Sequence, residues 1–304
     1  MKDFKGKNGF ITGAASALGI GRSFALALAK RGMNLFLTDI DMEGLEKVKK
    51  EVEKEGVRVF TSKCDVSIYK DFERVADEFY SKLGEVDLLI NNAGISLGGD
   101  MLNIDLEVWR KVIDTDLWSI IHSLKAFLPR MVKRGGGGHI VNIASGAGVI
   151  GSAEPLPYIA SKFGVVGLSE TFFARLKNLG INVSVIVPAW VKTNIIVIDT
   201  DKIQYPPKLL KHFGREKLDK AYKSLMDTIA EGAISSDDAV EKYIEGIEKD
   251  QLYVFDTDFY YELLAMKGND PKQYENFLVE GLMNRGKAFR AHFHKLGINI
   301  EDYM

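Results

Sequence analysis

Three residues near the middle of the chain have types and spacing that suit acid–base chemistry: Ser145, Tyr158 and Lys162. Tyr158 and Lys162 are four residues apart, so on a helix both side chains point to the same side. A free phenol has a pKa of about 10, and a lysine cation about 4 Å away at an effective dielectric of about 20 favours the phenolate by roughly 4 kcal/mol. Such a tyrosine takes a proton from an alcohol or returns one to a ketone oxygen, and Ser145 is expected to hydrogen-bond that oxygen.

A glycine-rich segment near the start of the chain has the features of a dinucleotide-binding loop. It reads Thr12-Gly13-Ala14-Ala15-Ser16-Ala17-Leu18-Gly19-Ile20-Gly21-Arg22 and lies between an expected strand and an expected helix. Glycine lets the backbone turn tightly and lets a pyrophosphate approach the helix N-terminus, where free N–H groups favour an anion. We therefore expect Gly13, Ser16, Gly19 and Ile20 to contact the cofactor.

An acidic residue, Asp39, ends the next expected strand, eighteen residues after Gly21. A carboxylate at this position accepts hydrogen bonds from both hydroxyls of the adenosine ribose and repels a 2′-phosphate. The sequence therefore predicts NAD as the cofactor and makes NADP less favoured. Asp41, two residues later, is interpreted as the N-cap of the following helix.

Short apolar runs alternate with longer amphipathic stretches, which predicts an α/β fold with a doubly wound parallel sheet of about seven strands and helices on both faces. The expected strands cover residues 8–12, 33–38, 58–62, 86–90, 139–143, 182–187 and 252–255. The expected helices cover residues 19–32, 42–55, 68–83, 106–133 and 157–178. Ligands of such sheets bind beyond the carboxyl ends of the strands, which is where the residues named above lie.

Over residues 6 to 256 the chain resembles the short-chain dehydrogenase/reductase family of Ser-Tyr-Lys type. The resemblance is carried by Thr12-Gly13…Gly19-Ile20-Gly21-Arg22, Asp65-Val66, Asn91-Asn92-Ala93-Gly94, Ser145, Tyr158-x-x-x-Lys162 and Pro188-Ala189-Trp190-Val191-Lys192-Thr193. It implies a Rossmann fold that binds a nicotinamide dinucleotide. It also implies that Asp65 and Val66 border the adenine.

The resemblance implies further cofactor contacts at three places. Asn91, Asn92, Ala93 and Gly94 would lie behind the cofactor. Pro188, Val191 and Thr193 would lie at the nicotinamide, where Val191 and Thr193 hold the carboxamide. Tyr158 and Lys162 would lie beside the nicotinamide, and Lys162 would bind the hydroxyls of its ribose.

Three departures from the family pattern stand out. Either the glycine loop is two residues longer than usual, with Gly19 and Gly21 as the last glycines, or Ala17 replaces a glycine and Gly19 is the last. The usual proline-glycine after the sixth strand is Pro188-Ala189 here. In Asp114-Thr115-Asp116-Leu117 an aspartate, Asp116, stands where the family usually has its fourth catalytic residue, an asparagine.

Two interpretations of Asp116 remain open. As a catalytic-site residue it could preserve the helix irregularity of the family, or pair with Lys162 and weaken the effect of the lysine on the tyrosine pKa. We therefore expect catalysis with an altered pH profile. The alternative is an ordinary helix aspartate without catalytic consequence.

The C-terminal third has no fixed motif. We divide the chain into a dinucleotide-binding and catalytic domain at 1–257 and an extension at 258–304, which is expected to pack on the domain or on a partner subunit. Within the domain, residues 194–232 contain the apolar run Ile195 to Ile198 and are interpreted as a substrate lid. The alternative for that stretch is a pair of surface helices with an apolar stripe facing the core.

Composition excludes several other classes of function. The 304 residues carry a net charge of −2, which disfavours nucleic acid as a partner. The single cysteine, Cys64, is interpreted as a small apolar strand residue. No apolar run reaches the roughly 18 residues of a membrane span, and no signal peptide is evident, so we expect a cytoplasmic protein. The five histidines lack metal-site spacing, and no metal is expected.

Three hypotheses of function follow. The first is an NAD-dependent oxidoreductase that interconverts an apolar secondary alcohol and its ketone. The second is an NADP-dependent carbonyl reductase of the same fold, which Asp39 argues against. The third is a cofactor-binding regulatory protein with weak or no catalysis, for which Asp116 is the only support. A homodimer or homotetramer is expected from the resemblance alone.

Overall fold

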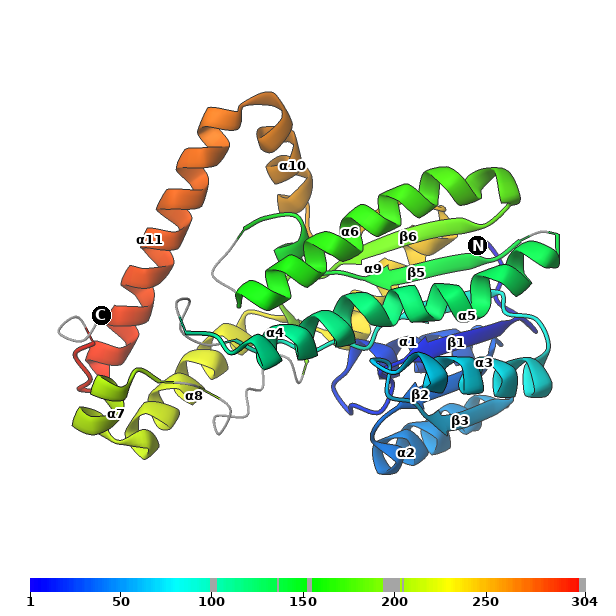
Figure 1. Cartoon of the computed structure of the whole chain (residues 1–304), viewed down its shortest axis with the longest axis horizontal. Coiled ribbons are helices and arrows are strands. Elements are labelled where there is room, and N and C mark those ends of the chain that lie inside the picture. Colours follow the sequence, from blue (N-terminus) through cyan, green and yellow to red (C-terminus); the bar gives the residue numbers. More distant parts are fainter. Residues whose placement is uncertain (99–102, 136, 152–154, 194–202, 204, 301–304) are drawn as a thin grey trace.

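A parallel seven-stranded sheet forms the centre of the protein in the computed structural model, which describes residues 1–98, 103–135, 137–151, 155–193, 203 and 205–300. Its order is β3-β2-β1-β4-β5-β6-β9, and every neighbouring pair is parallel (Figure 1). The strands are β1 (Asn8–Thr12), β2 (Asn34–Asp39), β3 (Val59–Lys63), β4 (Leu88–Asn91), β5 (His139–Ile143), β6 (Asn182–Val187) and β9 (Tyr253–Phe255). This confirms the predicted doubly wound sheet.

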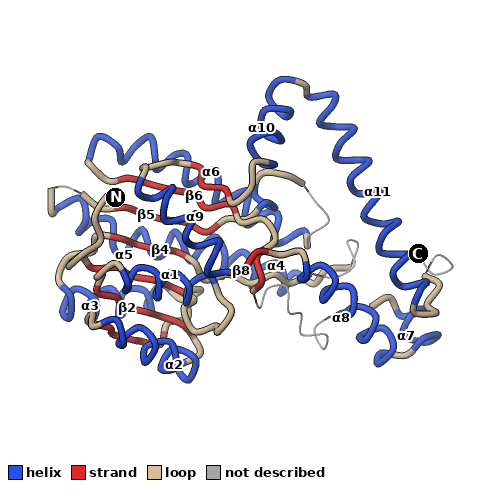
Figure 2. The backbone as a smooth tube through the Cα atoms, turned by 180° about the vertical axis from the view of Figure 1, so that it is seen from behind, coloured by secondary structure: helices blue, strands red, loops and turns tan. Residues whose placement is uncertain are grey.

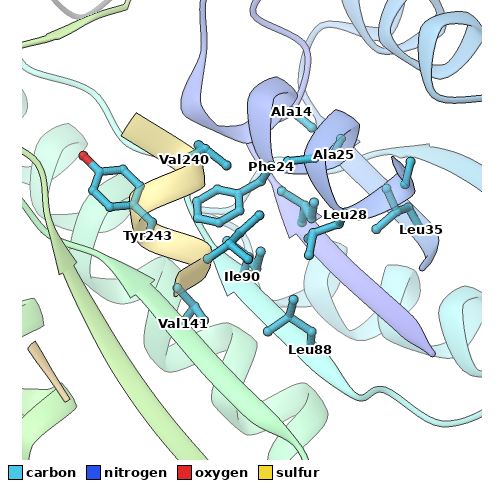
Figure 3. Packing of buried hydrophobic residues seen from close by; sticks show 14 of the residues in the cluster. Ala14, Phe24, Ala25, Leu28, Leu35, Leu88, Ile90, Val141, Val240 and Tyr243 are labelled. Carbon is cyan, nitrogen blue, oxygen red and sulfur yellow. The ribbon is translucent and has the colours of Figure 1, made fainter. Parts of the chain in front are cut away.

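Helices cover both faces of the sheet because its strands are apolar on both sides. One face carries α1 (Ile20–Lys30), α2 (Met42–Val52) and α9 (Ser236–Glu248). The other carries α3 (Tyr69–Leu83), α5 (Ser119–Lys133) and α6 (Leu156–Leu176). Figure 3 shows the first face, where Phe24 and Leu28 of α1 and Val240 of α9 pack over the strand residues Ile90 and Val141.

The strand order reverses between β1 and β4, which places the site. From β1 the chain proceeds outward through β2 to β3, and from β4 it proceeds in the other direction to β6 and β9. In doubly wound sheets ligands bind at such a reversal, beyond the carboxyl ends of the strands, which here are β1 and β4.

Two features of the chain differ from the sequence prediction. The stretch predicted as one helix over 106–133 is α4 (Leu106–Ile113), a π-helical turn (Asp114–Trp118) and α5. A small second sheet pairs β7 (Val191–Lys192) with β8 (Ile234–Ser235), seen beside α9 in Figure 2. Two-residue strands have no periodicity to detect, which is why the sequence analysis missed them.

Besides α9, the described residues from 205 to 300 form four further helices. They are α7 (Pro207–Phe213), α8 (Arg215–Glu231), α10 (Phe259–Asn269) and α11 (Pro271–Lys295). Helix α10 packs into the core around β9, whereas the far end of α11 packs against α7 and α8 through Phe293 and Leu218 (Figure 1). The described part of the predicted lid is thus a helix pair whose apolar stripe meets α11, while Ile195 to Ile198 lie outside the described residues.

None of the helices within the described ranges combines the length and the apolar character that crossing a bilayer requires.

Candidate active site

The structure brings Ser145, Tyr158 and Lys162 to the carboxyl edge of β5. Ser145 is half-buried directly after the strand, and its Oγ accepts a hydrogen bond from the Ala147 N–H at 3.2 Å. Tyr158 and Lys162 lie in the first two turns of α6 and are 6% and 3% exposed. The Lys162 Nζ lies 5.3 Å from the centroid of the Tyr158 ring. A buried cation at this distance stabilises the phenolate form of the tyrosine.

Backbone contacts fix the lysine relative to the serine. The Lys162 Nζ donates a hydrogen bond at 3.1 Å to the carbonyl of Ile143, two residues before Ser145. The 3-10 turn Gly146–Gly148 that follows Ser145 packs on α6 so closely that a Cβ on Gly148 would lie 2.7 Å from the Lys162 carbonyl oxygen. The two segments therefore hold each other without intervening side chains.

Asp116 lies in the π-helical turn and is 1% exposed. Its Oδ1 accepts from the Ile95 N–H at 2.8 Å, and its Oδ2 accepts from the Ser161 hydroxyl at 3.2 Å. The same Oδ2 lies 3.6 Å from the Lys162 Nζ. Burial raises the pKa of the Asp116 carboxyl, and the Lys162 charge and these two donors partly offset that rise. The helix irregularity and the pairing with Lys162 both occur in this structure.

The glycine loop is shaped by approaches that leave no room for a side chain. Gly13 has a φ of +67°, and a Cβ there would lie 2.7 Å from the Ala93 Cα. A Cβ on Gly21 would lie 2.4 Å from the Gly13 carbonyl oxygen. Gly21 therefore serves as the glycine that lets helix α1 pack on the loop, which favours the alignment with a loop two residues longer than usual.

The loop is also held by the segment after β4. The Thr12 hydroxyl accepts hydrogen bonds from the backbone N–H groups of Asn92 and Ala93, at 2.9 and 3.0 Å. The Asn92 side chain donates in return to the carbonyls of Thr12 and Gly13, both at 2.9 Å. The sequence motif placed Asn92 behind the cofactor but did not predict these bonds, because the partners of its side chain are backbone atoms.

The start of α1 fits a phosphate group. Gly19 is its N-cap and Ile20 its first residue, and its described first turn has neither a side-chain cap nor an acidic residue. The Ser16 Oγ is buried beside it without a hydrogen-bond partner among the described residues. Uncapped N–H groups and an unpaired hydroxyl are donors suited to an anion.

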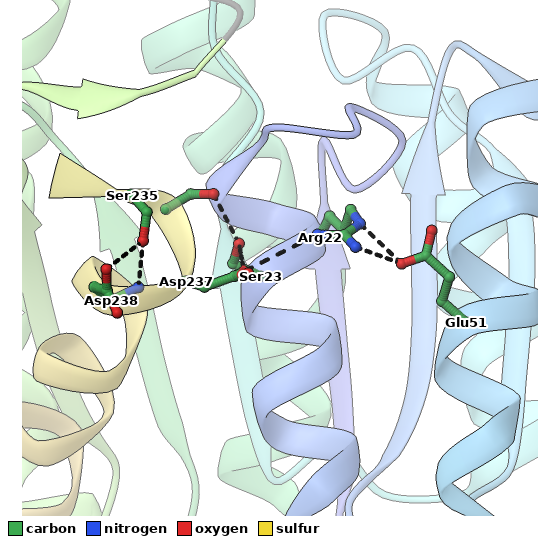
Figure 4. A network of polar contacts seen from close by, with 7 residues as sticks. Arg22, Ser23, Glu51, Ser235, Asp237 and Asp238 are labelled. Carbon is green, nitrogen blue, oxygen red and sulfur yellow. Dashed lines mark hydrogen bonds and ion pairs between the residues drawn. The ribbon is translucent and has the colours of Figure 1, made fainter. Parts of the chain in front are cut away.

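Side-chain bonds hold α1 in place on both sides, as Figure 4 shows. Arg22 donates to the Glu51 carboxylate of α2, with Nε to Oε2 at 3.0 Å. The Ser23 hydroxyl donates to Asp237 at 2.5 Å and to Ser236 at 3.0 Å, both in α9.

Asp39 lies at the end of β2 with its carboxylate turned towards the glycine loop. Its Oδ2 accepts from the Ala15 N–H at 3.0 Å, and its Oδ1 accepts from the Asp41 N–H at 3.1 Å. Each carboxylate oxygen has a second lone pair for a ribose hydroxyl. Asp41 accepts from the Gly44 N–H at 3.0 Å as the N-cap of α2, which confirms its interpretation.

The remaining predicted cofactor contacts occupy the same edge of the sheet with different local roles. Asp65 accepts from the N–H and hydroxyl of Ser67, and Val66 is buried against α3 and α5. The Asn91 side chain donates to Asn142 within the sheet at 2.8 Å.

Closer to the catalytic residues, a Cβ on Gly94 would lie 3.3 Å from the Lys162 Nζ. Pro188 accepts from the Gly146 N–H at 2.9 Å. Val191 is buried in β7, and Thr193 follows that strand.

Comparison with known proteins places this geometry in a family. Residues 7–202 match the family described as short chain dehydrogenase. Over 195 residues the chain is 35% identical to cyclohexanol dehydrogenase from Acinetobacter sp. strain SE19, covering 64% of this chain and 76% of that protein. A solved short chain dehydrogenase/reductase from Burkholderia phymatum in complex with NAD is 29% identical with a TM-score of 0.77, covering 90% and 96% of the two chains.

A second solved structure, a metagenomic short-chain oxidoreductase in complex with NADP, is 32% identical with a TM-score of 0.58, covering 61% of this chain and 83% of that one. The chain belongs to the short-chain dehydrogenase/reductase family. It is accordingly an oxidoreductase with a Rossmann fold, and the neighbours that hold NAD and NADP support a nicotinamide cofactor.

Proposed function

We propose that the protein is an NAD(H)-dependent oxidoreductase that interconverts a secondary alcohol and its ketone. The observation that carries the proposal is the buried pair of Tyr158 and Lys162, with the lysine Nζ 5.3 Å from the phenol ring centroid and bonded to the strand end beside Ser145. The likeness to a cyclohexanol dehydrogenase supports this substrate class.

Proton transfer in this proposal belongs to Tyr158. Oxidation of an alcohol removes a hydride from the carbinol carbon and a proton from the hydroxyl, and a nicotinamide cofactor, when bound, would supply the acceptor for the hydride. The Tyr158 phenolate takes the proton, and in the reverse direction the phenol returns it to the ketone oxygen. Lys162 favours the phenolate through its charge, and Ser145 donates a hydrogen bond to the substrate oxygen.

The preference for NAD over NADP rests on Asp39. Its carboxylate is fixed by the N–H groups of Ala15 and Asp41. A 2′-phosphate at this point would bring two anions together, whereas free ribose hydroxyls donate to the carboxylate.

An apolar substrate is favoured by the surroundings of Tyr158. The phenol packs in a cluster with Val112 and Ala147, and Ile95 and Leu97 lie against it. Such a surface stabilises cyclic or aryl carbinols better than charged ones.

Turnover and binding test the proposal separately. We expect the protein to quench or shift NADH fluorescence on titration and to reduce NAD with a panel of cyclic and aryl secondary alcohols. Tyr158→Phe should keep NADH affinity within about threefold and lose at least about a hundredfold in kcat. Binding without turnover on any alcohol would favour a regulatory protein, and equal turnover by Tyr158→Phe would refute the acid–base role.

A further inference from the structure

We propose that Tyr260, from the C-terminal extension, is a positioning residue that fixes the turn carrying Ser145. The inference rests on the proposed function, in which Ser145 hydrogen-bonds the substrate oxygen. It assigns part of the active site to a segment that lies more than a hundred residues away in the sequence.

The contact between Tyr260 and the turn is unusually close. A Cβ built on Gly146 would lie 1.8 Å from the Tyr260 hydroxyl oxygen and 2.5 Å from the ring carbon that carries it. The tyrosine is 8% exposed, and its ring lies 5.7 Å from that of Phe255 at the end of β9. The hydroxyl therefore rests directly on the backbone of the residue after Ser145.

The turn is confined from its other sides as well. Its Gly148 packs on the Lys162 carbonyl, as described above, and its Gly146 N–H donates to Pro188 at 2.9 Å. Ser145 caps the same turn through the Ala147 N–H. Removal of Tyr260 leaves one wall of this arrangement open, so the Ser145 hydroxyl loses a fixed direction relative to Tyr158.

Two further contacts from the extension reach the residues that follow the turn. The Lys267 Nζ donates to the Val149 carbonyl at 3.5 Å and lies 5.3 Å from the Phe163 ring centroid, next to Lys162. Tyr274 of α11 packs against the buried cluster that contains Val149 and Ile150. Helices α10 and α11 thus contact the segment from Gly146 to Ile150, and Tyr260 contacts the residue next to Ser145.

A pair of single variants and their double variant test the contact. Gly146→Ala should clash with Tyr260 and lower kcat by about tenfold or more, since small displacements of positioning groups cost up to about a hundredfold. Tyr260→Ala should lower kcat to a similar extent. In Gly146→Ala/Tyr260→Ala the added methyl group has room, so the double variant should match Tyr260→Ala alone. Gly146→Ala/Tyr260→Phe should still clash, because two ring carbons would lie 2.5 and 2.9 Å from the new methyl group.

Hydrogen exchange provides a readout that needs no substrate. The amides of Ala147, Gly148 and Val149 bond back onto Ser145 and Gly146. In Tyr260→Ala these amides should exchange faster by about tenfold or more, while the amides of β1 and β4 keep their protection. Tyr261→Phe is the control. Tyr261 is 49% exposed, so the loss of its hydroxyl, next to Tyr260 in the sequence, should not change exchange in the turn.

The outcomes separate the two proposals. Unchanged NADH affinity, faster exchange in the turn and a double variant whose kcat equals that of Tyr260→Ala support the positioning role. Unchanged exchange in a folded Tyr260→Ala protein, or additive losses in the double variant, would overturn it. If the wild type oxidises no alcohol, the proposed function fails, and the exchange data still decide whether Tyr260 orders the Ser145 turn.

Discussion

The N-terminal glycine loop and the C-terminal extension both reach the active-site edge, but they differ in how much room their glycines leave for a side chain. In the loop, backbone meets backbone, so that added atoms on Gly13 or Gly21 would lie within 2.7 Å of main-chain atoms. In α10 and α11, Gly268 and Gly281 have nothing within 4 Å of an added Cβ. The loop is therefore fixed by backbone packed on backbone, whereas the extension meets the site through a few side chains, among which Tyr260 approaches Gly146 very closely.

The sharpest way to break this comparison is to add the same methyl group in each region. Gly21→Ala should lower the free energy of unfolding by about 3 kcal/mol, because the Gly13 carbonyl oxygen cannot give way without moving the loop. Its NADH affinity should fall with it. Gly281→Ala, in the interior of α11, should instead gain about 0.5–1 kcal/mol of helix stability.

Chemical denaturation and NADH titration of the two variants provide the measurement. Wild-type NADH affinity in Gly21→Ala would show that the loop adapts, and the contrast between the two regions would then be lost.

Acid should destabilise the sheet through a buried histidine. His139, at the start of β5, is fully buried against Ser184, and burial lowers its pKa to about 3. In the unfolded state this histidine binds a proton near pH 6.5, whereas in the native state it stays neutral until the pH is close to 3. The free energy of unfolding is therefore at its full value above about pH 6.5 and decreases as the pH falls towards 3. By pH 5 the loss should reach about 2 kcal/mol.

The slope of unfolding free energy against pH measures this effect. His139→Gln should flatten the slope between pH 7 and 5, and His294→Gln, at an exposed position of α11, should leave it unchanged. Equal slopes in the wild type and His139→Gln would contradict the prediction.

A variant of Asp39 tests whether the charge of this carboxylate makes the protein prefer NADH over NADPH. Asp39→Ala should weaken NADH binding by roughly tenfold, since hydrogen bonds to a charged group contribute about 1.5–3 kcal/mol. It should strengthen NADPH binding by removing the repulsion of a 2′-phosphate. Parallel titrations with both cofactors provide the test, with Asp41→Ala as the helix-cap control. An unchanged ratio of the two affinities would argue against the role of Asp39.

The same contrast explains what the sequence could predict. The seven strands were predicted because short β-rich runs of three to six residues alternate with longer helical stretches, and the catalytic and glycine motifs because their spacing is local. Ser161 bonding to Asp116, Asn92 bonding to Thr12 and Tyr260 resting on Gly146 were not found. These pairs come together only through tertiary packing, so no spacing in the sequence predicts them.

The smallest expected effect concerns Asp116, which lies beside Lys162. Its carboxylate lies 3.6 Å from the Lys162 Nζ, and burial raises its pKa. The ionised form of this carboxylate counteracts the positive charge of Lys162, which stabilises the Tyr158 phenolate. Asp116→Asn keeps an oxygen for the Ile95 N–H and removes that charge, so the acidic limb of the pH–rate profile should move to lower pH. Profiles of kcat/KM for both proteins provide the measurement, and coincident limbs would show that Asp116 is an ordinary helix residue.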